Sequence, residues 1–358
     1  MAAYTQDIRF IRLFKLRYIG DVLLTTPAIR LIRQSYPDAH ITMVVNSGTK
    51  DVIRYNPHID NIITIDRRMI EEADLYSRLQ YEWNTLKALR EQPCDLSVDF
   101  DSGERAAYLS LLSNTRIRIG LRYSKGIRKL IFNRQVKINS RTHTVERNLM
   151  LVEQAIDLSR TDAILELYTS SEEEDYIDSW LHSNGLLHRD YVVVHPGARF
   201  WFKRWSIEKW AAAIDLIQRE LCMPVVISGG QKELDDVMAI SSMMTTPVYS
   251  IAGRTSILDL AVLLKKAALF IGNDSGPTHI AAASGTKVIA LFGPTSPAVW
   301  RPWGDGHTVI YRQFDCSPCG RIHCDLDKES CMEKISVAEV FSAVCQCLAE
   351  RETANSIL

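Results

Sequence analysis

The chain has 358 residues, 46% of them hydrophobic and 24% charged, a balance typical of a globular protein with more than one domain. The formal net charge of -1 argues against a nucleic-acid-binding protein. No apolar run approaches the roughly 20 residues that cross a bilayer, and the N-terminal stretch lacks the pattern of a secretory signal, so we expect a cytosolic protein.

The first half of the chain alternates short β-branched runs with amphipathic stretches, the pattern of a parallel sheet covered by helices. Strands are predicted over residues 8–16, 40–45, 61–65, 95–99 and 116–120. Helices are predicted between them, among others over 23–34, which Pro37 follows, and over 75–90, which Pro93 follows. The polar, acidic segment 170–189 is expected to hold the junction between two domains, within or just after its helix.

The same pattern restarts at residue 191. Strands are predicted over 191–195, 224–228, 248–252, 269–272 and 287–292, and helices over 207–220, 232–243, 257–266 and 277–284. We therefore predict an α/β fold with two Rossmann-like domains, residues 1–170 and 189–335, facing a central cleft at the carboxyl ends of both sheets. The segment 336–358 contains an amphipathic helix that we expect to pack back on the first domain.

The stretch FIGNDSGPTHIAAASG, residues 270–285, predicts a strand, a turn of small residues and a helix that begins near Pro277. Free N–H groups and the positive end of the helix dipole then favour phosphate oxygens. Thr278 and His279 lie in the first turn, where they could add donors. The alternative is an ordinary capped helix, with Asp274 or Ser275 as the cap.

The stretch HPGARFWFKRWS, residues 195–206, follows a predicted strand and begins with His195. Lys203 could neutralise charge on a diphosphate leaving group, although a solvated basic loop is the alternative. The aromatic run FWF within it is costly to leave in water and favours a cleft or a partner site. Glu233 follows a strand and a Gly-Gly turn, where it could accept hydrogen bonds from a ribose or serve only as a first-turn acid.

The sequence KLRYIGDVLLTTPAI places Asp21 directly after the first strand. A carboxylate there can act as a general base toward an acceptor hydroxyl, or as a helix N-cap. The acidic triplet formed by Asp99, Phe100 and Asp101 could suggest a metal-diphosphate site, but it closes a strand in the first half and is interpreted as a strand-end feature. No G-x-G-x-x-G follows a first strand, which argues against a dinucleotide oxidoreductase.

Ten lysines and arginines but only one acid lie between residues 116 and 147. This asymmetry suits a phosphorylated acceptor or an anionic membrane surface, and a solvated basic face is the alternative. We expect Arg122, Lys125 and Arg128 to bind acceptor phosphates.

Four of the eight cysteines cluster near the C-terminal end, in CSPCGRIHC and seven residues beyond it. In a cytosolic protein, thiols or metal ligands are expected rather than disulfides. Cys-x-x-Cys followed by two more thiols is compatible with a tetrahedral metal site, but the later spacing differs from that of zinc ribbons, so no metal is predicted. The residues concerned are Cys316, Cys319, His323, Cys324 and Cys331.

Together these motifs resemble glycosyltransferase family 9, the ADP-heptose:lipopolysaccharide heptosyltransferases. The resemblance covers most of the chain and is strongest over residues 13–39, 195–206 and 270–285. It implies a GT-B architecture and an inverting transfer of heptose from ADP-heptose to the lipopolysaccharide inner core, with no essential metal and no cofactor besides the donor. The opening motif and WRPWG, residues 300–304, favour the heptosyltransferase III branch.

The resemblance also implies roles for single residues. Asp21 matches the general base, Lys203 the cation at the leaving diphosphate, and Glu233 the ribose contact. The family often has threonine at the position of Ser275, a difference that keeps the hydroxyl. The expected partners are the lipopolysaccharide core and, peripherally, the cytoplasmic face of the inner membrane, and no nucleic acid. The donor-binding residues implied are His195, Lys203, Glu233, Asp274, Ser275, Gly276 and His279.

Two other functions fit parts of the sequence. A nucleotide-sugar 2-epimerase has the same two-domain layout but needs no basic acceptor surface. A non-catalytic nucleotide-binding module with a cysteine-metal appendage needs no Asp21 and should show no turnover.

Overall fold

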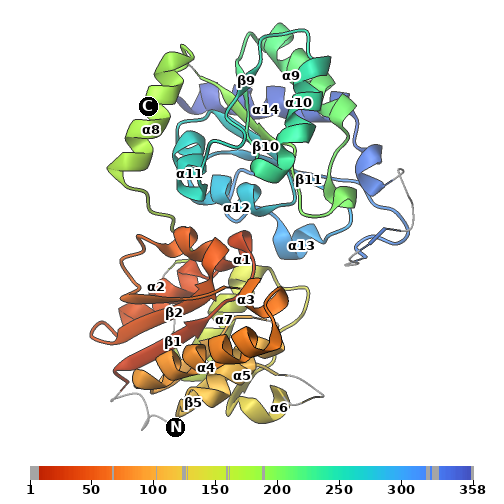
Figure 1. Cartoon of the computed structure of the whole chain (residues 1–358). Helices are drawn as coiled ribbons and strands as arrows, with labels where there is room; N and C mark the ends of the chain where they lie inside the picture. The colour runs from red at the N-terminus through yellow and green to blue at the C-terminus, as the bar shows by residue number, and fades with distance from the viewer. Residues whose placement is uncertain are drawn as a thin grey trace. The chain divides into compact units, whose positions relative to one another are not determined.

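The structure, a computed structural model, describes residues 8–66, 68–101, 103–122, 126, 128–158, 160, 162–187, 190–319, 323–324 and 330–355. It divides into two compact units, Met1–Tyr168 and Thr169–Leu358 (Figure 1). Helix α8 (Ser171–Ser183) occupies the predicted junction. The division therefore falls before this helix, and not within or after it as the sequence suggested.

Six parallel strands form the sheet of the first unit, in the order β3-β2-β1-β4-β5-β6. Five of them match the predicted strands to within two residues at each end. The sixth, β6, was not predicted, because its sequence RQV contains no β-branched or apolar run. The strands are β1 (Phe10–Phe14), β2 (His40–Asn46), β3 (Asn61–Ile65), β4 (Leu96–Asp99), β5 (Ile117–Leu121) and β6 (Arg134–Val136).

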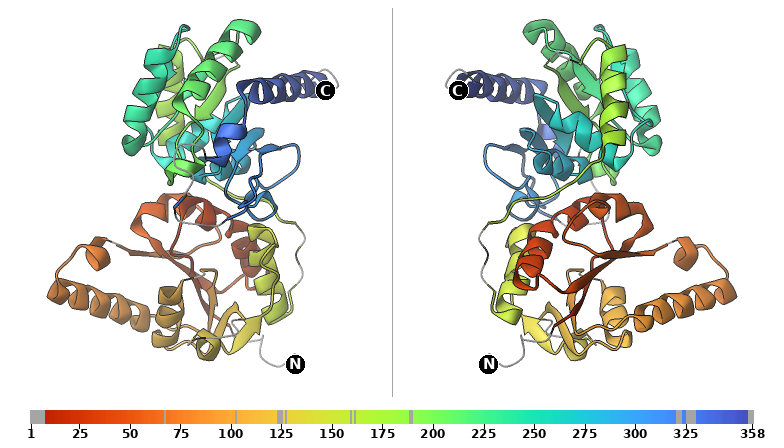
Figure 2. Two further views of the ribbon diagram at one scale, coloured as in Figure 1. Left: turned by 90° about the vertical axis from the view of Figure 1, so that its right-hand side faces the viewer. Right: turned by 90° about the vertical axis from the view of Figure 1, so that its left-hand side faces the viewer.

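Helices cover both faces of this sheet. Helices α2 and α7 contact each other, and the Arg105–Glu82 ion pair of 2.6 Å joins α5 to α4. Figure 2 shows α4 on one face of the sheet and α7 on the other. The helices are α1 (Ile19–Leu23), α2 (Thr26–Ser35), the 3₁₀ helix η1 (Ser47–Ile53), α3 (Arg68–Glu71), α4 (Leu75–Glu91), α5 (Glu104–Leu112), α6 (Arg128–Ile131) and α7 (Thr144–Ile156).

The predicted helix over 23–34 corresponds to α2, which begins at Thr26, three residues later than expected. The short helix α1 before it, which ends at Leu23, was not predicted. Pro27 lies in the first turn of α2, where a missing N–H costs no hydrogen bond. A proline in the middle of one continuous helix would have removed a backbone bond.

The second unit repeats the layered arrangement around a sheet of order β12-β11-β10-β7-β8-β9. Every residue of β10 and β11 is buried. The short strand β12 was not predicted. The strands are β7 (Val192–His195), β8 (Val225–Ile227), β9 (Tyr249–Ser250), β10 (Leu269–Asn273), β11 (Val288–Phe292) and β12 (Thr308–Tyr311).

The helices of the second unit follow the predicted pattern. After α8 come the 3₁₀ helix η2 (Trp201–Lys203), α9 (Ile207–Leu221), η3 (Gln231–Glu233), α10 (Leu234–Met243), α11 (Ile257–Lys265), α12 (Gly276–Ala283), α13 (Pro297–Trp300), η4 (Cys331–Lys334) and α14 (Val337–Asn355). Within the described ranges, none of the helices in either unit has the length and apolarity that a membrane span requires.

The C-terminal helix α14 belongs to the second unit. The expectation that it packs on the first unit was therefore wrong. Its Val340, Val344 and Cys347 are buried in one apolar cluster with Trp210 of α9 and Ile289 of β11. The apolar face that the sequence revealed is therefore used within the second unit.

Candidate functional site

The predicted donor residues all follow the carboxyl ends of three adjacent strands of the second sheet. His195 ends β7, Glu233 follows β8, and Asp274 and Ser275 follow β10, while the sheet order places β7 between the other two strands. Parallel strands bring these ends to one edge, where ligands of open α/β sheets bind. The second unit alone thus gathers most of the residues that the donor motif suggested.

The turn after β10 presents a helix N-terminus, as predicted. Pro277 lies in the first turn of α12, and Thr278 Oγ1 donates to the carbonyl of Asn273 over 2.6 Å. His279 in the same turn is buried. In the described part of the structure, the shielded Ser275 hydroxyl has no hydrogen-bond partner and does not cap the helix. A buried hydroxyl without a protein partner at a helix N-terminus is suited to an anionic ligand.

Lys203 and Asp274 form an ion pair at this turn. The Lys203 Nζ lies 2.6 Å from Asp274 Oδ2, and the Thr295 hydroxyl donates to the same oxygen over 2.5 Å. The Asp274 side chain is nearly buried, whereas that of Lys203 is partly exposed. Asp274 therefore positions the ammonium group, and Lys203 is the member that a ligand can reach.

Asn273 connects the two donor motifs, although the sequence did not single it out. Its side-chain amide donates to the carbonyl of Pro196 over 2.6 Å and accepts from the backbone N–H of Trp205 over 3.3 Å. Both partners belong to the 195–206 segment. A polar residue at the end of an entirely buried strand is the signal that could have identified it, because buried amides need partners.

His195 and Glu233 form a second polar pair. His195 Nε2 lies 3.6 Å from Glu233 Oε2, and His195 Nδ1 lies 3.2 Å from Ser228 Oγ. The hydrogen bond from His195 is the largest cause that lowers the pKa of Glu233 to about 2, and the backbone N–H of Gly230 adds to it. A Cβ at Gly197 would lie 2.0 Å from Glu233 Oε1, so a side chain at this position would require the Glu233 carboxylate to move. The lowered pKa makes Glu233 an ionised acceptor at neutral pH.

Asp21 lies in α1, directly after β1 in the first unit. Its carboxylate is 3.0 Å from the Nζ of Lys15, a buried side chain that also donates to the carbonyl of Phe100 over 3.3 Å. Lys15 was not among the residues predicted from the sequence. A lysine at the end of a strand predicted to be buried was the available signal, since such a charge needs a partner.

The acidic triplet is part of the same strand edge. Asp99 ends β4, and Asp101 accepts a hydrogen bond from the backbone N–H of Leu16 over 3.0 Å. Burial raises the pKa of Asp99 well above its ordinary range, and the Asp101 carboxylate raises it further. These contacts support the interpretation as a strand-end feature.

The basic segment does not form a single surface. Arg122 is exposed at the carboxyl end of β5, whereas Arg116 lies at the opposite end of this strand. Arg128 is buried and donates to the carbonyl of Asp101 over 3.3 Å, so it is no exposed phosphate ligand. Lys125 lies outside the described residues. Of the three predicted acceptor contacts, only Arg122 is described as an exposed cation.

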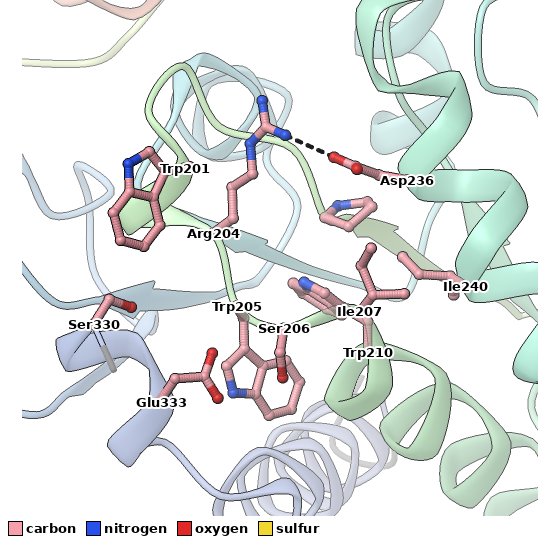
Figure 3. A pocket seen from close by; sticks show the side chains of 11 residues that line it. Trp201, Arg204, Trp205, Ser206, Ile207, Trp210, Asp236, Ile240, Ser330 and Glu333 are labelled. Carbon is pink, nitrogen blue, oxygen red and sulfur yellow. Dashed lines mark hydrogen bonds and ion pairs between the residues drawn. The ribbon is translucent and has the colours of Figure 1, made fainter. Parts of the chain in front are cut away.

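The aromatic run of the 195–206 segment borders a cavity of about 220 Å³ (Figure 3). Trp201, Trp205 and Trp210 line it, and the 2.7 Å pair of Arg204 and Asp236 lies at its margin. The lining includes none of the predicted donor residues. Of the run FWF, Trp201 alone is among the lining residues, so the expectation of a cleft is met by one of the three aromatic side chains.

The four clustered cysteines are all free thiols. Burial raises the pKa of Cys331, and Cys319 and Cys324 raise it further. Among the residues that the structure describes, no three His, Cys, Asp or Glu side chains are arranged to hold a metal ion.

Comparison with known proteins shows which family the chain resembles. The sequence profile of Glycosyltransferase family 9 (heptosyltransferase) matches residues 83–329. Lipopolysaccharide heptosyltransferase 3 of Escherichia coli K12 is 34% identical over 296 residues, which cover 80% of this chain and 83% of that protein. A second Lipopolysaccharide heptosyltransferase 3 from Escherichia coli is 29% identical and covers 96% of this chain and 100% of its own.

Solved structures share the architecture. A family 9 glycosyltransferase from Veillonella parvula superposes with a TM-score of 0.81 at 24% identity, covering 96% of this chain and 98% of that one. The Escherichia coli heptosyltransferase WaaC with ADP superposes with a TM-score of 0.75 at 18% identity, covering 94% and 99%. These similarities confirm the predicted α/β fold of the GT-B type.

Proposed function

This chain belongs to glycosyltransferase family 9, the heptosyltransferase family, and on that premise we propose that it transfers heptose from ADP-heptose to the lipopolysaccharide inner core. The observation that carries the proposal is the Lys203–Asp274 pair beside the unpartnered Ser275 hydroxyl at the start of α12. An ammonium group, a hydroxyl donor and a helix N-terminus together suit the diphosphate of a nucleotide sugar.

Each proposed step uses residues of this chain. Asp21 accepts the proton of the acceptor hydroxyl as its oxygen attacks the anomeric carbon of heptose. The bond from that carbon to the diphosphate breaks on the opposite face, and its electron pair leaves with ADP. Lys203, His279 and the N-terminus of α12 stabilise the departing charge, which grows most in the transition state.

The same contacts suggest how the ribose is bound and why no metal ion is needed. Glu233, held ionised by His195, accepts hydrogen bonds from the ribose hydroxyls. Ser275 and Gly276 contact the diphosphate through the hydroxyl and the backbone. We propose that the lysine and the helix terminus replace a divalent ion, so the enzyme needs no metal or further cofactor.

The acceptor contact and the location are also proposals. Arg122, exposed at the carboxyl end of β5, binds an acceptor phosphate, and the enzyme works peripherally at the cytoplasmic face of the inner membrane. The similarity to two proteins named lipopolysaccharide heptosyltransferase 3 supports an inner-core acceptor of that branch.

The test is to incubate the protein with ADP-heptose and a series of truncated core acceptors, and to weigh the products. We expect one acceptor to gain the mass of a single heptose with release of ADP. Conversion of the donor without any acceptor would favour the epimerase alternative, and ADP binding without product would favour a non-catalytic module. The Asp21→Asn variant serves as the control for background hydrolysis.

A further inference from the structure

The buried ring of His195 has both of its nitrogens beside side chains of the second unit. Nδ1 lies 3.2 Å from Ser228 Oγ, and Nε2 lies 3.6 Å from Glu233 Oε2. An ionised carboxylate has no proton to give, so Nε2 carries the proton in its contact with Glu233. A donor molecule could bond to either nitrogen only by displacing Ser228 or Glu233.

Ser228 holds this ring from the side opposite Glu233. It directly follows β8, and its backbone N–H donates to the carbonyl of Val194 in β7 over 2.9 Å. Its hydroxyl donates to the same carbonyl over 3.0 Å, which leaves the lone pairs of the oxygen to accept from Nδ1 of His195. Ser228 therefore connects the ends of two paired strands and fixes the imidazole between them.

The two carboxylate oxygens of Glu233 have different surroundings. Oε2 accepts from the backbone N–H of Gly230 over 2.6 Å and also faces His195. Oε1 lies against the backbone of Gly197, and no residue that the structure describes donates a hydrogen bond to it. The side chain of Glu233 is 18% exposed, whereas that of His195 is 7% exposed. Oε1 is therefore the oxygen that remains for a ligand.

We propose that His195 and Ser228 are positioning residues, which hold Glu233 so that its Oε1 receives a hydroxyl of the donor's ribose. His195 and the Gly230 N–H engage Oε2, and Ser228 keeps the imidazole in place, so neither His195 nor Ser228 touches the donor. The inference rests on the proposed function, in which Glu233 binds the ribose. It assigns a role to Ser228, and it replaces the expectation that His195 is itself a donor contact.

The test compares the affinity for ADP with that for 2′,3′-dideoxy-ADP, which lacks both ribose hydroxyls, by calorimetry without an acceptor. Wild type should bind ADP about tenfold more tightly, the worth of a hydrogen bond to a charged group. His195→Phe, which keeps a planar ring without nitrogens, should lower this preference to about twofold, and Ser228→Ala should lower it to about threefold. Misfolding reduces the amount of active protein but not a ratio of two affinities. Lys203→Ala is the control, because it should weaken both nucleotides equally at the diphosphate that they share.

A double variant separates an indirect role of His195 from a direct contact. His195→Phe combined with Glu233→Gln should bind ADP as weakly as Glu233→Gln alone, because His195 acts through that carboxylate. A further loss in the double variant would overturn the proposal, and so would a full ribose preference in both His195→Phe and Ser228→Ala. If wild type shows the preference and the variants lose it, but no heptose is transferred, the proposed function fails and the positioning role stands.

Discussion

Each unit carries a lysine–aspartate pair at the carboxyl edge of its sheet. In one pair the lysine is the buried member, and in the other the aspartate is. In the first unit the Lys15 side chain is 3% exposed and that of Asp21 is 20% exposed. In the second unit Asp274 is 8% exposed and Lys203 is 20% exposed. One unit therefore presents a carboxylate and the other an ammonium group.

This difference matches the two needs of glycosyl transfer. A base must take a proton from the acceptor, and a cation must meet the charge of the leaving diphosphate. In each pair the buried member holds the reachable one in place. The predictions below test this comparison, from the largest expected effect to the smallest.

Removing the reachable member of the first pair should be the most damaging change. Asp21→Asn should lower turnover by about 10² to 10⁴, because a positioned base is lost. ADP affinity, measured by calorimetry, should stay near wild type, since the proposed diphosphate contacts lie in the second unit. Retention of more than about a tenth of wild-type turnover would exclude Asp21 as the base.

Removing Lys203, the reachable member of the second pair, should affect ADP binding as well as turnover. Lys203→Ala should lower turnover about 10²-fold and also weaken ADP binding, because its charge acts in the ground state and in the transition state. Lys265→Ala, which removes an exposed lysine of the same unit, is the control. If only the acceptor KM rose, Lys203 would belong to the acceptor side and the comparison would fail.

The carboxylate of Glu233 should matter less than either pair. Glu233→Gln should weaken ADP binding about tenfold, because a neutral amide accepts weaker hydrogen bonds from ribose hydroxyls than a carboxylate does. A lowered pKa means that Glu233 stays ionised at neutral pH and protonates only as the pH falls toward about 2. Donor affinity that fell around the ordinary pKa of a glutamate, in wild type but not in Glu233→Gln, would contradict this environment.

Charge reversal at Arg122 should raise the acceptor KM a few-fold and leave the donor KM unchanged. Exposed charges act only over about 8 to 10 Å at ordinary salt, so the effect should shrink as salt rises. Arg116→Glu is the matched control, because Arg116 lies at the other end of β5. An equal effect of both variants on a soluble acceptor would mean that general attraction, and not a local contact, is measured.

The smallest expected effect is that of a chelator. EDTA should leave turnover unchanged, because in the proposed mechanism Lys203 and the start of α12 supply the positive charge at the diphosphate. Activity lost with EDTA and restored by magnesium or manganese would refute this. Activity restored only by zinc would direct attention to the cysteine cluster.

The sequence by itself determined most of the fold. Strands buried in parallel sheets have sequences that are continuous runs of β-branched and apolar residues. Ten of the twelve strands in the described part of the chain were therefore predicted from local pattern. The misses have local reasons. Strand β6 has the sequence RQV, which contains no apolar run, and Pro27 in the first turn of α2 places the start of that helix three residues later than the hydrophobic spacing suggested.

Motifs also predicted the local structure of the candidate donor site, because a strand, a small-residue turn and a helix start are contiguous in the chain. Their partners were not predictable in this way. Seventy-one residues separate Lys203 from Asp274, and 85 separate Lys15 from Phe100. Such contacts form only when neighbouring strands bring distant loops to one sheet edge.

The tertiary structure decided which charges a ligand can reach. The sequence showed ten cations in one segment, but folding buried Arg128, placed Arg122 and Arg116 at opposite ends of a strand, and left Lys129 on a helix beside an exposed leucine. It likewise assigned α14 to the second unit, where Val340 and Val344 are buried. The sequence determines the charge and hydrophobicity of each residue. Its exposure to solvent depends on how the strands and helices pack, and local sequence does not encode that packing.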